Sequence, residues 1–220
     1  MDPIARAMFM GPARLPEVEL PEVAIGAAFE GGYYAGLISH TANGRPTHAL
    51  IVAPAATGAT GTGYTLTTNK QLQNPMSVTN ATSNYDGAAN TALWTNSQAA
   101  DFCTGLTIGG YSDWYLPARY ELEIAYYNLK PSTTSNNTYP GVNPYAVPPR
   151  TASFTSSDPA QTSVTAFQTG NSEAFVTSTH LQSTETSQYY GYSTNFSDGA
   201  LSGFFKPNSG PVRAFRKIAL

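Results

Sequence analysis

Charged residues are scarce in this sequence of 220 residues. Lys, Arg, Asp and Glu together make up 11%, well below the quarter that is usual for soluble domains. The formal net charge is -3 and no Lys/Arg stripe exists, which argues against binding to nucleic acid. Hydrophobic residues still make up 41%, so the chain can bury a core. The polar surface must then consist mainly of Ser, Thr, Asn, Gln and Tyr, which is typical of a loop-rich exposed protein rather than a helical cytosolic enzyme.

Cysteines and long apolar runs are also lacking. Cys103 is the single cysteine, so no disulfide can form within the chain, which suits assembly in a reducing cytoplasm. No run reaches membrane-spanning length, and Gly11-Pro12 interrupts the short apolar stretch near the start, which makes a poor signal peptide. The surface composition is typical of a protein exposed outside the cell, yet the chain is expected to assemble in the cytoplasm. This combination suggests release by cell lysis, as for a phage particle.

The residues that carry metal or catalytic chemistry are few and badly spaced. His40, His48 and His180 show no spacing typical of metal ligands. Cys103 falls on the apolar face of an expected helix, which indicates a buried structural thiol rather than a nucleophile. The glycine-rich stretch 58–63 lacks the Lys-Ser/Thr of a phosphate-binding loop. We therefore expect no catalytic residues, no metal and no cofactor, and we expect that the chain is not an enzyme.

The first half of the chain contains an extended segment followed by strands and loops. Residues 1–25 carry four prolines and cannot form a long helix; they are either a loose terminus or an extended anchor that ties the domain to a larger assembly. Residues 26–39 indicate a strand pair or a bent strand, and the apolar run 47–56 a buried strand. We expect residues 57–92 to form surface loops and short strands.

Two helices are expected in the middle of the chain. The first begins near Asn96-Ser97, which can cap it, and precedes Gly109-Gly110. The second begins after Pro117. Its apolar face should carry Ala118, Leu122, Ala125, Tyr126 and Leu129, and its other faces Arg119, Glu121, Glu123 and Asn128.

The second half of the chain is rich in Ser, Thr, Asn, Tyr and Gly. From Ser132 to about Pro211 we expect short strands with long connections and no helix. Alternation of side chains from Gly210 to Leu220 predicts one terminal strand.

One segment is more specific than the rest of the chain. From Gly109 to Leu122 it reads GGYSDWYLPARYEL, and Ser183-Thr-Glu185 and Val212–Arg216 follow further along. These segments resemble the Legionella collagen-like protein C-terminal domain family, also called DUF1566, as found in phage tail-associated proteins. Two departures stand out: Ala118 replaces a frequent hydroxyl residue, which should weaken the helix cap, and His180-Leu181-Gln182 replaces a frequent tryptophan.

The resemblance implies an α+β, C-type-lectin-like fold. It has two helices, small antiparallel sheets and a long loop-rich region, and it covers residues 26–220 as one domain. The structural motif comprises Asp113, Trp114, Pro117, Glu121, Arg213 and Arg216.

Each motif residue has a structural interpretation. Trp114 should be buried, Asp113 should accept backbone hydrogen bonds in a turn, and Glu121 should face the positive end of the helix dipole. Arg213 or Arg216 should reach one of these acids from the closing strand.

Tyrosine-rich loops suggest where a ligand binds. Tyrosine provides large rigid contact area and small polar residues adapt to a partner, as in evolved binding surfaces. The expected ligand-binding residues are Tyr189, Tyr190, Tyr192, Asn195 and Asp198.

Three functions are compatible with these features. The first is a bacteriophage virion protein (tail fibre, baseplate or other appendage) that binds a host surface receptor, either a glycan or a protein. The second is a structural decoration or collar protein. The third is a surface polysaccharide hydrolase, for which Asp158, Glu173, Glu185 and Asp198 would supply the carboxylates. We expect residues 1–25 to bind other virion proteins, the chain to form a homo-oligomer in the particle, and the domain to be exposed on the virion after assembly in the host cytoplasm.

Overall fold

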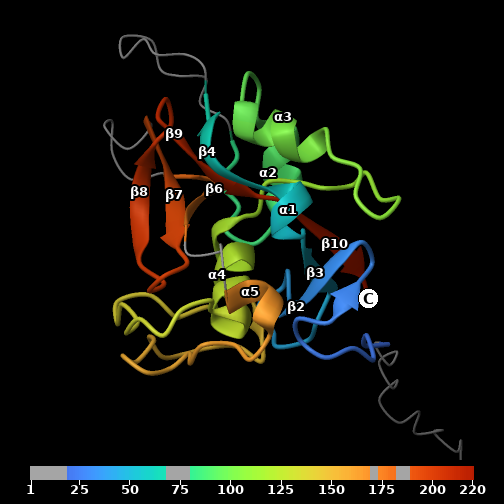
Figure 1. The fold of residues 1–220 in the computed structure, drawn as a ribbon, viewed down its shortest axis with the longest axis vertical. Helices are drawn as coiled ribbons and strands as arrows, with labels where there is room; N and C mark the ends of the chain where they lie inside the picture. The colour runs from blue at the N-terminus through green and yellow to red at the C-terminus, as the bar shows by residue number, and fades with distance from the viewer. Residues whose placement is uncertain (1–18, 68–79, 169–172, 182–188) are drawn as a thin grey trace, which may run out of the picture.

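The computed structural model describes residues 19–67, 80–168, 173–181 and 189–220. Within these ranges the chain is an α+β protein with short helices and three antiparallel sheets (Figure 1). The Ser183-Thr-Glu185 segment and residues 1–18 of the expected anchor lie outside the described residues.

The largest sheet joins the start of the domain to its end. Its strands lie in the order β1-β2-β3-β10, and β5 pairs with β2. They span Ala28–Phe29 (β1), Gly32–Ile38 (β2), His48–Val52 (β3), Ala146–Val147 (β5) and Phe215–Ala219 (β10). The strands expected within residues 26–39 and 47–56 are thereby confirmed.

Two smaller sheets use the remaining strands. One pairs β4 (Ala59–Thr65) with β9 (Ser209–Arg213), and the other joins β6 (Ala174–His180), β7 (Tyr190–Asn195) and β8 (Leu201–Phe205). The expectation of one terminal strand was wrong. Ala214 separates β9 from β10, and its backbone bonds to Ala53 and Gly58 direct the two strands into different sheets.

The two expected helices are present. α3 (Gln98–Thr104) is capped by the Ser97 hydroxyl, which accepts from the Ala100 N–H, and α4 (Arg119–Leu129) follows Pro117. Three further short helices are α1 (Ala55–Gly58), α2 (Gly87–Leu93) and α5 (Thr165–Gln168). None of the helices in the described ranges has the length and apolar character needed to cross a membrane.

Two of these short helices correct the sequence analysis. α2 lies where loops and short strands were expected, because its sequence GAANTAL has few large apolar residues and a helical apolar face is hard to recognise. Asp86 caps it. α5 lies in the region expected to lack helices, and only Phe167 of its residues is buried.

The core forms on both sides of α4. In Figure 1 this helix lies between the β1-β2-β3-β10 sheet and the β6-β7-β8 sheet. One apolar cluster surrounds α4 and contains Leu122, Tyr126, Phe154, Phe175 and Phe215. A second lies beneath α3 and contains Trp94, Cys103, Trp114, Leu116 and Val212. Cys103 is fully buried, as expected for a structural thiol.

Trp114 is a core residue, as the motif predicts. Its ring is 1% exposed and its Nε1 donates to the Tyr111 carbonyl oxygen at 2.9 Å. Truncation to alanine leaves a cavity and an unpaired acceptor.

We therefore expect Trp114→Ala to lower the free energy of unfolding by about 3–5 kcal/mol, as for other large-to-small changes of buried aromatic rings. Chemical denaturation measures this change. A loss of about 1 kcal/mol in the free energy of unfolding lowers the melting temperature by several degrees. A melting temperature of Trp114→Ala within about two degrees of the parent would therefore contradict the core assignment.

Candidate binding surface

A continuous strip of half-buried rings crosses the described surface. We call it the aromatic strip; it consists of His48, His40, Tyr85, Tyr145, Tyr120, Arg119 and Tyr192. Successive ring centroids lie 4.2, 5.2, 4.3 and 5.5 Å apart from His48 to Tyr120. The Arg119 guanidinium then lies 5.1 Å from the Tyr120 ring and 5.0 Å from the Tyr192 ring. Each of the seven residues keeps part of its surface in contact with solvent.

Residues of the strip come from segments far apart in the sequence. His40 and His48 flank the connection between β2 and β3, Tyr85 precedes α2, and Arg119-Tyr120 open α4. Tyr145 precedes β5 and Tyr192 lies on β7. The strip therefore extends from the largest sheet to the β6-β7-β8 sheet across the first turn of α4, and only the tertiary fold assembles it.

Glu121 fixes the centre of this surface. Its side chain is fully buried, with Oε2 accepting from the Gly87 N–H at 3.0 Å and from the Ala118 N–H at 2.8 Å. Oε1 accepts from the Tyr115 hydroxyl at 2.9 Å. The expectation that Glu121 lies away from the buried face was wrong, because the carboxylate satisfies the free N–H groups of two helix starts. Burial raises the pKa of Glu121 to about 7.

The start of α4 is capped from elsewhere in the fold. Ala118 offers no side-chain acceptor, and the Arg119 N–H instead donates to the Thr179 hydroxyl oxygen of β6 at 3.0 Å. The Tyr120 N–H donates to the Asn84 carbonyl oxygen at 2.7 Å. These bonds and Glu121 align Arg119 and Tyr120 with Tyr85.

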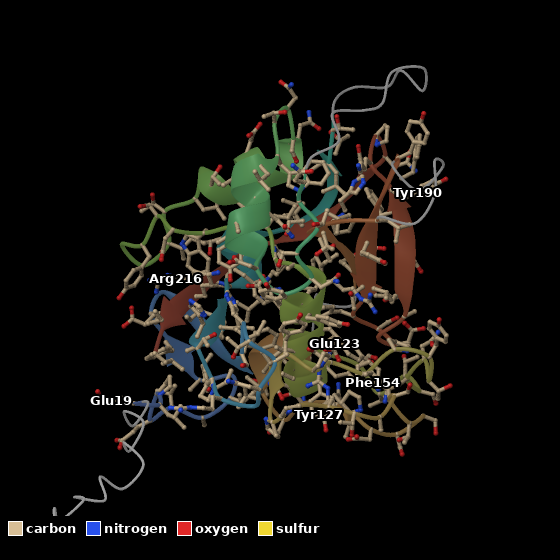
Figure 2. All side chains as sticks on the ribbon, turned by 180° about the vertical axis from the view of Figure 1, so that it is seen from behind. Glu19, Glu123, Tyr127, Phe154, Tyr190 and Arg216 are labelled. Carbon is tan, nitrogen blue, oxygen red and sulfur yellow. The ribbon has the colours of Figure 1, made fainter. Side chains whose placement is uncertain are left out.

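A second buried acid positions Tyr145. Glu123 Oε2 accepts from the Arg150 guanidinium and from the Asn143 amide, contrary to the expectation of an outward-facing side chain. Asn143 Oδ1 in turn accepts from the Tyr145 N–H at 3.0 Å. Figure 2 shows Glu123 on α4 close to Tyr127 and Phe154, and the Arg150 guanidinium lies 4.3 Å from the Tyr127 ring. The carboxylate thus holds the loop that carries Tyr145 against α4.

A small cavity of about 10 Å³ opens beside the strip at Arg119 and Tyr120, a volume close to that of one water molecule. Glu123 and Thr194 also line it. Both residues are buried, and Glu123 Oε1 and Thr194 Oγ1 lack a hydrogen-bond partner among the described residues. The remaining lining residues are Pro140, Gly141, Val142, Gly199 and Leu201. A buried oxygen without a partner is costly, so the cavity is suited to a small polar group.

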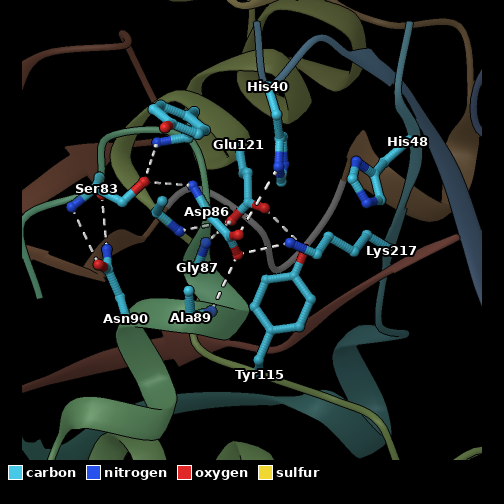
Figure 3. A network of polar contacts seen from close by, with 12 residues as sticks. His40, His48, Ser83, Asp86, Gly87, Ala89, Asn90, Tyr115, Glu121 and Lys217 are labelled. Carbon is cyan, nitrogen blue, oxygen red and sulfur yellow. Dashed lines mark hydrogen bonds and ion pairs between the residues drawn. The ribbon is translucent and has the colours of Figure 1, made fainter. Parts of the chain in front are cut away.

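A titratable cluster forms the other end of the strip (Figure 3). Asp86 Oδ1 accepts from the Lys217 ammonium at 2.6 Å and from the Ala89 N–H at 3.0 Å, and Asp86 Oδ2 lies 3.8 Å from His40 Nδ1. Burial, followed by the charges of Lys217 and His48, lowers the pKa of His40 to about 4. The stacked histidines are therefore neutral rings at neutral pH.

The expected ligand residues lie in three places. Tyr192 belongs to the strip. Tyr190, labelled in Figure 2, contacts Phe205 with ring centroids 5.5 Å apart, and Tyr189 directly precedes it. Asn195 ends β7 and Asp198 lies in the turn that follows, and their side-chain oxygens accept from the Ser197 and Ala200 N–H groups, respectively. At about 3.3 Å per strand residue, Asn195 is roughly 16 Å from Tyr190.

The motif residues have structural roles. The Arg216 guanidinium binds both carboxylate oxygens of Asp113, at 2.8 and 3.1 Å, which confirms the expected ion pair between the closing strand and the motif. The sequence analysis expected turn N–H groups as the partners of Asp113, whereas the structure shows the Arg216 guanidinium in that role. Arg213 is buried and donates to the Ala53 carbonyl oxygen at 2.7 Å. Pro117 accepts from the Ser178 N–H at 2.8 Å.

The carboxylates considered for hydrolysis are dispersed. Asp158 and Glu173 are exposed, Asp198 is used in its turn, and Glu185 lies outside the described residues. In the described part of the chain no three His, Cys, Asp or Glu side chains are arranged to hold a metal ion.

No family model matches this sequence, and no curated protein matches it. The description of the surface therefore depends on its geometry. Sequence reasoning did not select Tyr85, Arg119, Tyr120 or Tyr145 as ligand-binding residues. The available signal was a tyrosine next to each helix start, since Tyr85 precedes the capping residue Asp86 and Tyr120 follows Pro117-Ala118-Arg119.

Gly87 offers a direct test of the Glu121 arrangement. A Cβ at this position would lie 2.4 Å from Glu121 Oε2 and 2.5 Å from the Ala118 nitrogen. We expect Gly87→Ala to lower the free energy of unfolding by about 1–3 kcal/mol, because the backbone at the start of α4 must shift to make room for the methyl group.

Gly61→Ala is the matched control, since nothing lies within 4 Å of its added Cβ. Urea denaturation of both variants measures the difference. Equal stability of the two variants would contradict the close approach of α2 to Glu121.

The histidine end predicts a pH dependence. Folding lowers the pKa of His40 from 6.5 to about 4, so the unfolded chain binds more protons at this site between these values. The stability from neutral His40 is present above pH 6.5 and is lost as the pH falls toward 4. Between about pH 7 and pH 5, the free energy of unfolding of the parent should fall by up to about 2 kcal/mol more than that of His40→Gln.

Comparison of parent and variant is needed because Glu121 has the opposite effect. Its raised pKa adds stability as the pH falls, and it does so equally in both proteins. Parallel pH profiles for the two proteins would show that His40 is not held neutral by its surroundings.

Proposed function

We propose that this chain is a bacteriophage virion protein that binds an extended glycan on a host surface through the aromatic strip. The strip itself carries this proposal: seven rings and planar groups, partly open to solvent, follow one another beside a small cavity that Glu123 and Thr194 help to line. Sugar rings pack on aromatic faces, and a few well-placed polar groups then orient the ligand, as in other apolar binding sites. An extended strip suits an oligosaccharide better than a single sugar.

The composition of the surface supports the same function. Tyrosine loses little conformational entropy when it binds, and here the rings are already held by contacts with one another. Val142 and Tyr139, which are 48% and 87% exposed, lie at or next to the cavity lining and extend the contact surface. The dispersed carboxylates favour binding over hydrolysis.

The wider assignment belongs to this proposal as well. The resemblance of Gly109–Leu122 to the DUF1566 family supports a C-type-lectin-like fold, and the α+β architecture agrees with it at the level of class. The described part of residues 1–25 lies at the end of the domain opposite to Tyr190 of β7 (Figure 2), which supports attachment of the domain to the particle at that end. There Leu20 and Pro21 line a depression with Phe29, Ile218 and Leu220, and such an apolar face suits contact with another virion protein or a second copy.

Binding should depend on individual rings of the strip. We expect Tyr192→Ala and Tyr145→Ala each to weaken binding by about 2 kcal/mol, or roughly 30-fold, if the ring is an anchor. Purified fluorescent chain is titrated onto a panel of bacterial strains, and onto polysaccharide extracted from the strains that bind.

Tyr64→Ala is the matched control, because Tyr64 is a half-exposed tyrosine that packs on Phe102 outside the strip. Melting temperatures check that each variant is folded. If both strip variants bind like the parent, the strip is not the binding surface. If no strain or polysaccharide binds the parent, the structural decoration role replaces receptor binding.

A further inference from the structure

Arg119 stands out among the charged groups of the aromatic strip. Its guanidinium lies between the Tyr120 and Tyr192 rings and remains partly exposed. It makes no ion pair with any carboxylate in the part of the chain that the structure describes. Its backbone N–H is used by Thr179, but the printed contacts of its side chain are with rings only.

Neighbouring charges cancel in pairs. Glu123 binds Arg150, and Asp86 binds Lys217. Glu121 and Glu123 are the acids near Arg119 on α4. Glu121 accepts from Gly87, Ala118 and Tyr115, and Glu123 Oε2 accepts from Arg150 and Asn143. Glu123 also interacts electrostatically with Arg119, so Arg119, Arg150 and Glu123 together carry one net positive charge. The Arg119 guanidinium is the part of this group that lies against two aromatic rings of the strip.

The adjoining cavity supplies a second polar contact. Glu123 Oε1 and Thr194 Oγ1 lack partners, both residues are more than nine-tenths buried, and Arg119 lines the same cavity. Burial raises the pKa of Glu123 above its usual range. Glu123 and Thr194 both line this space of about 10 Å³, which matches a single hydroxyl group, since the volume is close to that of one water molecule.

We infer that the strip recognises an acidic glycan, with an anionic group of the sugar on the Arg119 guanidinium and a neighbouring hydroxyl in the Glu123–Thr194 cavity. This inference depends on the proposed glycan-binding function and specifies its ligand class. A guanidinium offers two parallel N–H donors to a carboxylate or phosphate, and stacking between rings orients that fork in advance. The two sources of negative charge share this chemistry and are separated by the test.

The test uses the purified full chain on an array of neutral, uronic-acid, sialylated and phosphorylated glycans. The parent should bind the acidic members, and its affinity should fall as salt rises from about 0.05 to 0.5 M, because added ions screen the exposed charge. Arg119→Gln should lower affinity for these glycans by about 10- to 100-fold, the range expected for a hydrogen bond to a charged group. Retention of uronic and sialylated glycans alone identifies a carboxylate, and retention of phosphorylated glycans alone a phosphate.

Three variants complete the design. Arg119→Lys keeps the charge but loses the fork, so its affinity should lie between those of the parent and Arg119→Gln. Arg45→Gln removes a positive charge from the β2–β3 connection, outside the strip, and should bind like the parent. Thr194→Val removes the cavity hydroxyl and should weaken acidic glycans severalfold without changing the salt dependence.

The outcomes separate the two levels of the proposal. If the parent binds neutral glycans as tightly as acidic ones, and Arg119→Gln leaves binding unchanged, the acidic ligand class is wrong although glycan binding stands. If the folded parent binds no glycan of any class, the proposed function itself fails, and this inference fails with it.

Discussion

The buried carboxylate of Glu121 holds together the chain segments on which the aromatic strip depends. It accepts hydrogen bonds from the starts of α2 and α4 and from Tyr115. These two helix starts carry the central rings of the strip, Tyr85 and Tyr120. Without an acceptor at this point, two buried N–H groups would be unsatisfied and the helix starts would separate. The absence of a side chain at Gly87 allows the close approach, since a Cβ there would overlap Glu121 and the α4 backbone.

Binding energy and folding energy are supplied by different groups in this arrangement. Buried acids, with Arg150, Asn143 and Gly87, fix the backbone beneath the strip, whereas the rings above it retain exposed faces. In the proposed function, a glycan meets a surface that is already ordered, and little entropy is lost on binding. In the proposed function, Arg119 and the Glu123–Thr194 cavity add selectivity for acidic sugars to the aromatic surface.

Sequence reasoning was most successful where local signals are strong. The cap at Ser97, the helix after Pro117 and the strand within residues 47–56 follow from capping, proline and apolar patterning. The burial of Trp114 follows from its large ring and its place in the motif. It failed where tertiary contacts override local pattern. Glu121 and Glu123 have the sequence appearance of solvated helix residues. Both are buried, and donors distant in sequence bind their carboxylates, Gly87 for Glu121 and Arg150 for Glu123. The strip itself was beyond prediction, because its rings become neighbours only when β2, α2, α4 and β7 pack together. Tyr192 is the residue of the strip that the sequence had also suggested for ligand binding, because it lies in the densest tyrosine cluster of the sequence.

The central claim is that a glycan lies along the aromatic strip, and ring-selective NMR tests it most directly. Tyrosine rings are labelled with ¹³C in the full chain, and a polysaccharide that the chain binds is titrated in. The account predicts that the ring signals of Tyr85, Tyr120, Tyr145 and Tyr192 shift together with one affinity, while those of Tyr64 and Tyr33 stay in place. Shifts confined to tyrosines outside the strip, with these four signals unmoved at saturation, would contradict it.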